Sequence, residues 1–190
     1  MRRRLLLVAA EAMSTPSFHV LPAPHPATLP IEALVGVCTW GRTRASGPGG
    51  QHRNKVETAI WMRHEATGIE AQASERRSAE ENKRVAIGRL RLELALGVRC
   101  LVPLGEIRSA LWKSRCSAGG IIACNPAHED FPRLIAEALD VIHAASWDVK
   151  RASLRLCCSQ SQLIKLIKDF PAGFARLNQE RLAAGLHILK

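Results

Sequence analysis

The sequence predicts an α+β fold, in which a short mixed sheet with one packed helix is followed by a small all-helical unit. Strands are expected over 38–44, 58–64 and 69–74, where β-forming residues gather and a turn at 65–68 joins the last two. Apolar residues then take up helical spacing from Ser78, and again from Phe131. Strands first and helices afterwards are typical of an α+β arrangement.

Residues 1–30 are predicted to form a flexible, proline-rich leader. The start, Met1-Arg2-Arg3-Arg4, is followed by an apolar run that ends at Glu11 and is too short to span a membrane. Five prolines in 14–30 favour an extended tether over a domain. We therefore expect a cytoplasmic protein without membrane contact. The arginine-rich start leaves an organellar matrix as the alternative.

Residues 31–106 are predicted to form the first domain, with a short helix beginning near Ile31 and a long helix from Ser78 to Gly97. Ser78 is expected to cap the amide of Glu81, and Glu81 to reach back to Ser78. Glu80 is one turn from Arg84 and can pair with it. The buried stripe of this helix is expected to consist of Ile87, Leu90 and Leu94.

Residues 107–130 are predicted to be an irregular linker, because the stretch from 99 to about 130 holds Pro103, Gly105, Gly119, Gly120 and Pro126. Residues 131–190 should form a helical domain, with helices starting near Phe131, at 148–156, at 160–169 and at Pro171. The pair over 148–168 resembles a helix-turn-helix of the factor-for-inversion type, with its turn at 156–159. A plain helical bundle is the alternative. In a true helix-turn-helix, Lys165 and Lys168 would bind phosphates.

The composition indicates a polyanionic partner. The chain has 190 residues, a formal net charge of +10 and a pI near 10, as is common for proteins that bind nucleic acid or an anionic membrane. Aromatic residues make up only 4%, with no tyrosine, which argues against a base-stacking sheet surface. None of the six cysteines has CxxC spacing, so we expect reduced thiols and no metal site.

The most informative segment is a glycine-rich loop, Ser46-Gly47-Pro48-Gly49-Gly50-Gln51. Its glycines can adopt backbone angles closed to other residues and allow a ligand to approach the backbone. Gln51 is the polar residue at its tip. Positive charge surrounds it at Arg42, Arg44, Arg53 and Lys55. On composition alone, a flexible turn would explain this loop equally well.

The longer string from Ser46 to Thr58 closely resembles the catalytic loop of class I peptide chain release factors and of the shorter ribosome-rescue hydrolases. The similarity continues through Thr67-Gly68-Ile69, through Glu75-Arg76-Arg77-Ser78 and through Asn82-Lys83. It covers roughly residues 36–98. We therefore expect residues 31–106 to form a release-factor-like catalytic domain.

The resemblance implies hydrolysis of the peptidyl-tRNA ester in the peptidyl transferase centre of the large ribosomal subunit. Gly49 and Gly50 would hold the backbone so that the amide of Gln51 faces developing charge, as in an oxyanion hole. The partners would be peptidyl-tRNA and rRNA, with no cofactor. Gln51 would also be the candidate for methylation by a glutamine methyltransferase. The expected RNA-binding residues are Arg42, Arg44, Arg53, Lys55, Arg76, Arg77, Lys165 and Lys168.

The sequence departs from full-length release factors. About 36 residues precede the first catalytic strand, too few for a stop-codon-reading domain, so codon-independent rescue of stalled ribosomes is the better expectation. A flexible basic tail, usual in short rescue hydrolases, is replaced by the helical unit. Two alternatives stay open: a nucleic-acid-binding regulator that uses the C-terminal helices, and a non-catalytic ribosome-associated factor.

Overall fold

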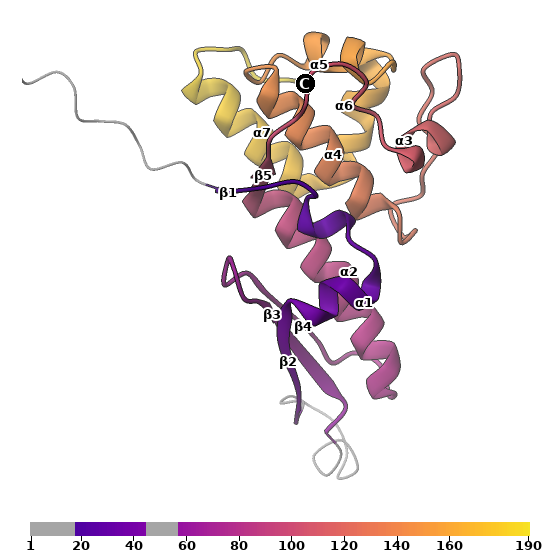
Figure 1. Cartoon of the computed structure of the whole chain (residues 1–190), viewed down its shortest axis with the longest axis vertical. Helices are drawn as coiled ribbons and strands as arrows, with labels where there is room; N and C mark the ends of the chain where they lie inside the picture. Colours follow the sequence, from indigo (N-terminus) through magenta and orange to yellow (C-terminus); the bar gives the residue numbers. More distant parts are fainter. Residues whose placement is uncertain (1–17, 45–56) are drawn as a thin grey trace, which may run out of the picture.

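A three-stranded sheet lies at one end of the molecule, a group of helices lies at the other, and the long helix α2 connects the two (Figure 1). The computed structural model describes residues 18–44 and 57–190. The sheet and its helix are formed by β2 (Cys38–Thr43), β3 (Ala59–His64), β4 (Glu70–Ala73) and α2 (Ala79–Gly97). The three predicted strands and the long helix are thereby confirmed.

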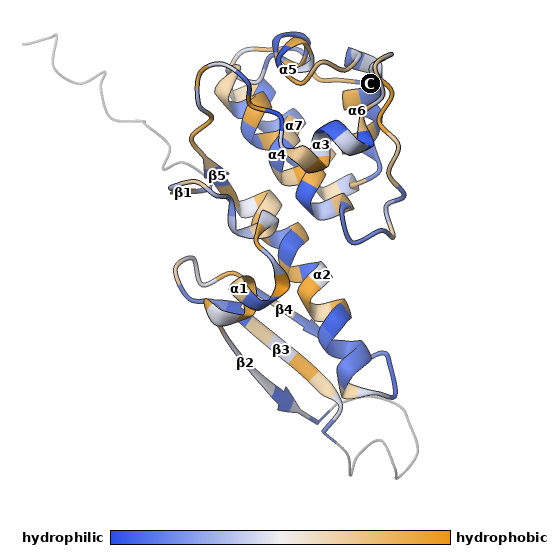
Figure 2. Ribbon diagram, turned by 45° about the vertical axis from the view of Figure 1, so that its right-hand side comes forward, coloured by the Kyte–Doolittle hydropathy of each residue, from blue (hydrophilic) through white to orange (hydrophobic). Residues whose placement is uncertain are grey.

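The sheet is antiparallel in the order β2-β3-β4, and α2 packs on one of its faces. Met62 is fully buried on that face and is paired with Trp40 of β2 and Ala71 of β4. The hydropathy colouring shows apolar residues along β3, the central strand (Figure 2). The sheet was predicted to be mixed. The parallel pairing is instead found in a separate two-stranded sheet.

Helix α2 begins close to the predicted cap, with one difference. Ser78 has the extended backbone of a cap residue, but its hydroxyl accepts from the amide of Glu80 at 3.2 Å, not from Glu81. The predicted reciprocal bond from Glu81 is not among the hydrogen bonds of the described residues, and Glu81 is exposed. The expected pair forms, with Glu80 Oε1 and Arg84 Nε 3.8 Å apart. The predicted buried stripe is confirmed at Ile87, Leu90 and Leu94.

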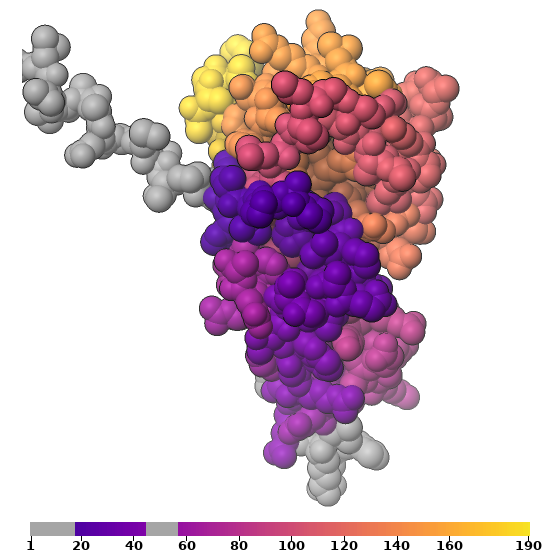
Figure 3. All heavy atoms as spheres, viewed as in Figure 1, coloured from indigo at the N-terminus to yellow at the C-terminus, as the bar shows by residue number. Residues whose placement is uncertain are grey.

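The prediction of a flexible leader is wrong for residues 18–30; residues 1–17 lie outside the described part. Strand β1 (His19–Leu21) pairs in parallel with β5 (Val98–Cys100), and a short 3-10 helix (Pro26–Thr28) follows. Ala27 has no exposed surface, so the prolines shape a packed turn here. Helix α1 (Ile31–Gly36) leads into β2, and this whole segment runs down one face of the molecule (Figure 3).

The stretch 107–130, predicted as an irregular linker, contains helix α3 (Ala110–Arg115) and belongs to the helical packing. Trp112 of α3 is fully buried, and its indole Nε1 donates to the carbonyl of Leu156 at 2.9 Å. A β-bridge between Cys116 and Ile122 closes a short hairpin. The backbone of Gly120 in that hairpin accepts from Ser159 N at 3.2 Å. The glycines had predicted an irregular stretch, but Gly119 and Gly120 instead form the tight turn of this hairpin.

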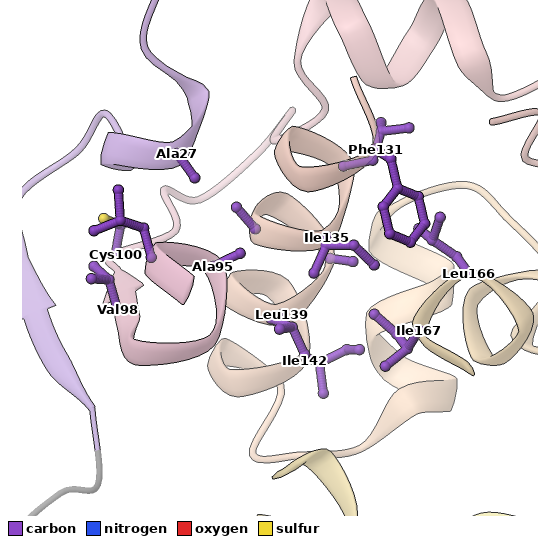
Figure 4. Packing of buried hydrophobic residues seen from close by; sticks show 14 of the residues in the cluster. Ala27, Ala95, Val98, Cys100, Phe131, Ile135, Leu139, Ile142, Leu166 and Ile167 are labelled. Atoms are coloured by element: carbon purple, nitrogen blue, oxygen red, sulfur yellow. The ribbon is translucent and has the colours of Figure 1, made fainter. Parts of the chain in front are cut away.

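Four helices follow as predicted: α4 (Phe131–Ala144), α5 (Val149–Arg155), α6 (Gln160–Lys168) and α7 (Pro171–Ala183). Asp148 caps α5 and Ser159 caps α6 through side-chain oxygens that accept from backbone amides. Helix α4 packs against α2, α5 and α6. Figure 4 shows Ile135 of α4 between Ala95 of α2 and Ile167 of α6. The buried apolar residues of the sheet end and the helical end accordingly form one continuous cluster.

A buried carboxyl joins β5 to α4. Asp140 is 6% exposed, and its Oδ1 accepts from the amide of Cys100 at 3.0 Å. Burial raises the pKa of Asp140 to about 7, although the Cys100 amide and the Arg99 guanidinium both act to lower it. His25 lies nearby with Nε2 3.4 Å from the carbonyl of Val98, and burial lowers the pKa of His25 to about 4.

We predict that Asp140→Asn gains stability relative to wild type as the pH rises. The carboxyl of Asp140 holds its proton in the folded chain up to about pH 7, whereas its ordinary pKa is 3.8. Its stabilising contribution is therefore complete below pH 4 and is lost on going to pH 7. The free energy of unfolding, measured with denaturant, should rise for the variant relative to wild type by on the order of 3 kcal/mol between pH 5 and pH 8. The His25 contribution has the opposite sign and cancels between variant and wild type. A difference independent of pH would contradict the prediction.

Candidate functional site

The segment that carries the predicted catalytic residues lies between the end of β2 and the start of β3. Gly49, Gly50 and Gln51, together with Arg53 and Lys55, lie outside the described residues. Arg44 directly follows β2, and Glu57 and Thr58 directly precede β3. We call these two ends, Thr43–Arg44 and Glu57–Thr58, the stem.

The two sides of the stem are held together by the sheet and by one ion pair. Thr43 and Ala59 form the last register pair of β2 and β3. Beyond it, Arg44 Nε lies 3.5 Å from Glu57 Oε1, with both side chains more than half exposed. Exposed pairs of this kind contribute little to stability because water and salt screen them. The ion pair therefore orients the stem only weakly.

A buried asparagine on α2 holds the stem more firmly. Asn82 has no exposed surface, and its amide nitrogen donates to the carbonyl of Thr58 at 2.7 Å and to that of Arg76 at 3.0 Å. Its amide oxygen accepts from Arg76 N at 2.9 Å. The sequence comparison singled out Asn82-Lys83 only as part of a resemblance. The role of Asn82 was not predicted, because its three bonds join segments that are separate along the chain.

Four predicted RNA-binding residues are gathered at the stem end of the sheet. Arg42 and Arg44 lie at the end of β2, and Arg76 and Arg77 lie in the connection from β4 to α2. All four are exposed. The end of β2, the start of β3 and the end of β4 lie together because the strands are antiparallel. The structure thus forms a basic surface, Arg42, Arg44, Arg76 and Arg77, beside the stem.

Lys83 provides a further cation on the face of the sheet that α2 covers. The ammonium of Lys83, on α2, lies 4.0 Å from the ring centroid of Trp40, which is 38% exposed on the edge strand β2. A lysine over an indole face is attracted by the negative face of the ring, and this limits its motion. Sequence reasoning had not selected Lys83 as a binding residue, because a pair between strand and helix has no local pattern.

The two lysines predicted on the C-terminal helices lie far from the stem. Lys165 and Lys168 are exposed on α6, at the opposite end of the molecule from the sheet (Figure 1). Helices α5 and α6 are joined by the four residues 156–159, with Cys157 at a positive φ of 51°. Gln160 and Ser161 are exposed at the start of α6. The molecule therefore presents cationic residues at both ends.

The sheet contains one buried histidine among its described residues, at the end of β3 that is remote from the stem. His64, on β3, is buried, its Nδ1 is 2.8 Å from Thr67 Oγ1, and burial lowers its pKa. In residues 18–44 and 57–190, His, Cys, Asp and Glu side chains form no group of three or more that could hold a metal ion. Among the same residues, no helix is long and apolar enough to cross a membrane.

Comparison with protein families matches residues 37–99 to the RF-1 domain. This region includes β2, β3, β4 and α2, and it agrees closely with the 36–98 range of the sequence resemblance. The match covers a third of the chain, and it includes the stem and the segment between its two ends.

The similar proteins are release factors by name. Peptide chain release factor 2 of Sulfurovum sp. is 51% identical over 51 residues, which is 27% of this chain and 14% of that protein. A chloroplastic peptide chain release factor of Arabidopsis thaliana is 48% identical over 52 residues, 27% of this chain and 11% of that protein. An uncharacterized mitochondrial release-factor-like protein of Saccharomyces cerevisiae is 47% identical over 49 residues, 26% of this chain and 32% of that protein. The chain thus spans only a small part of the length of these curated relatives.

Proposed function

We propose that this chain hydrolyses the ester of peptidyl-tRNA on the ribosome, with Gly49, Gly50 and Gln51 as catalytic residues. The match of residues 37–99 to the RF-1 domain carries this proposal, because the Gly-Gly-Gln string lies inside the matched range. The release-factor names of the similar proteins support it at the level of the family. The basic surface beside the stem supports a partner made of RNA.

The chemistry proposed is attack of water on the ester carbonyl that joins the nascent peptide to the tRNA. A bond forms between the water oxygen and the carbonyl carbon, the ester bond to the tRNA 3′ oxygen breaks, and a proton passes to that oxygen. The backbone amide of Gln51 would donate to the negative oxygen of the tetrahedral intermediate. Its side chain would orient the water. No general base is assigned to the protein, so positioning within an RNA active site supplies the rate.

We further propose that release is independent of the codon and serves stalled ribosomes. Within this chain, the region matched to the RF-1 domain is combined with a helical unit, α4 to α7. Gln51 is proposed as a methylation site for a glutamine methyltransferase. A cytoplasmic location is proposed, with the organellar matrix as the alternative. A helix-turn-helix regulator is less favoured, because it leaves the match over 37–99 unexplained.

The first prediction from the proposed function concerns catalysis. Gly50→Ala should fold and bind ribosomes but lose at least a hundredfold in release rate, because the added Cβ would clash with rRNA or forbid the backbone angles that direct the Gln51 amide, and losing such a transition-state donor costs on the order of 3 kcal/mol. Gln51→Ala keeps the backbone amide and should lose less. Single-turnover release of labelled peptide at saturating protein separates chemistry from binding. Gly88→Ala is the control, since an added Cβ there meets nothing within 4 Å. Wild-type rates from Gly50→Ala would overturn the catalytic assignment.

The second prediction concerns salt. Ribosome binding should weaken steeply between low and moderate salt, because bound cations release counterions from RNA phosphates. The double variant Arg76→Ala/Arg77→Ala should lower the slope of log affinity against log salt by about one to two. Lys113→Ala provides the control, since Lys113 is exposed on α3 and paired with Glu106 at 3.4 Å. An affinity that hardly changes with salt would argue against a phosphate-binding surface.

The third prediction concerns recruitment by α6. Deleting the chain from residue 131 would remove α4 from the apolar face of α2, so surface substitutions provide a cleaner test. Lys165→Ala/Lys168→Ala should weaken ribosome association several-fold, or change which stalled complexes are bound, while the saturated release rate stays within about twofold of wild type. Release is compared on ribosomes with truncated mRNA and with mRNA continuing through a sense or stop codon. An unchanged affinity and preference would remove α6 from recruitment.

A further inference from the structure

Asn82 fastens three separate chain segments to one another. It lies in the first turn of α2, Thr58 immediately precedes β3, and Arg76 lies between β4 and α2. The three hydrogen bonds are 2.7 to 3.0 Å long and are made by a side chain with no exposed surface. A primary amide in a dry position is costly unless it is bonded, and here both of its polar atoms are used.

The hydrogen-bond partners fix the orientation of the Asn82 amide. Its nitrogen lies opposite two carbonyl oxygens, those of Thr58 and Arg76, and its oxygen lies opposite the Arg76 amide N–H. Exchanging nitrogen and oxygen would set acceptors against acceptors. Aspartate or leucine, though similar in size, cannot supply two donors and one acceptor. The position therefore requires an asparagine for chemical reasons.

The bond to Thr58 determines where the chain leaves β3. The register between β2 and β3 ends at Ala59, so Thr58 lies beyond the sheet ladder. Its carbonyl is held by Asn82 on the helix side of the sheet, whereas the neighbouring Arg44–Glu57 pair is exposed to solvent. A buried bond to an oriented amide is screened far less than an exposed ion pair. Asn82 therefore holds the stem more firmly than the Arg44–Glu57 pair does.

We infer that Asn82 is a positioning residue for the reaction, acting through Thr58 on the segment that carries Gly49, Gly50 and Gln51. This inference rests on the proposed function. Asn82 does not touch the substrate; it sets the direction of the stem relative to α2. The same side chain holds Arg76, so it also fixes the stem relative to the basic surface. Small displacements of a catalytic group cost large factors in rate, because the reacting geometry is narrow.

The test compares Asn82→Asp with wild type in single-turnover peptide release over a range of protein concentrations. At pH 8 the maximal rate should fall by about tenfold to a hundredfold, because the carboxylate cannot donate to Thr58. The half-saturating concentration should change less than threefold, because the basic surface keeps its residues. A fall confined to the half-saturating concentration would overturn the positioning role.

The dependence on pH provides a readout that a purely structural defect would not give. When the carboxyl group of the Asn82→Asp variant is protonated, it carries one O–H donor, which can restore the bond to the Thr58 carbonyl. Because this position has no exposed surface, burial should raise the pKa of the new carboxyl group toward this pH range. The ratio of wild-type to variant maximal rate should therefore shrink at least threefold between pH 8 and pH 6. Asn178→Asp is the matched control. Asn178 also bonds to backbone, with Oδ1 accepting from Leu189 N at 2.8 Å, but it lies on α7. Its rate ratio should stay near one at every pH.

The outcomes separate the inference from the proposed function. If wild type releases peptide and Asn82→Asp keeps its full maximal rate, the positioning role is wrong and the proposed function stands. If wild type releases no peptide, both are wrong. If Asn82→Asp does not fold by circular dichroism, Asn82→Ser replaces it, because its hydroxyl keeps one donor and one acceptor. A maximal rate reduced about tenfold, with unchanged half-saturation, would then support the inference, and a wild-type rate would overturn it.

Discussion

Helix α2 carries the constraint on which both ends of the molecule depend. Its first half covers the inner face of the sheet, where Asn82 holds the stem, and its second half packs on α4. Leu90 and Leu94 are fully buried in a cluster that extends from the sheet to α7. Burying apolar surface on both halves keeps one continuous helix in place without a hinge between the two ends. The stem and the helical unit are thereby fixed in a single frame.

Much of the fold could be predicted because its signals are local. The 3.6-residue spacing of α2 and the capping residues Asp148 and Ser159 lie within a few positions of the structure they specify. Pairing of β1 with β5 could not be predicted, since each strand has only three residues and the whole sheet and α2 separate the two strands along the chain. Trp112 was missed for a similar reason: its indole bonds to Leu156, and no local pattern in a glycine-containing stretch announces that contact.

The same distinction, between features with local sequence signals and features that depend on distant contacts, applies to the candidate site. Its catalytic residues, predicted from a contiguous string, lie at 49–51, outside the described residues. The cations at Arg42 and Arg76 were predicted from separate strings, and the antiparallel sheet brings them to one end. Asn82 and Lys83 show their importance only through contacts across the fold, with Thr58 and with Trp40. Sequence identifies reactive residue types, but the bonds that orient them join segments distant along the chain.

The length of α2 has a mechanical consequence. Nineteen residues of α-helix form a rod about 28 Å long, so a tilt of about 10° at its upper end would sweep its lower end through about 5 Å. That arc exceeds the displacement that a reacting geometry tolerates. Helices α5 and α6 pack on α4, and α4 packs on α2, so a tilt of α2 against α4 would displace the sheet end of α2 the most. The stiffness of the contact between α2 and α4 therefore limits how far the sheet end can move relative to the helical unit, and a softer contact would allow a larger displacement.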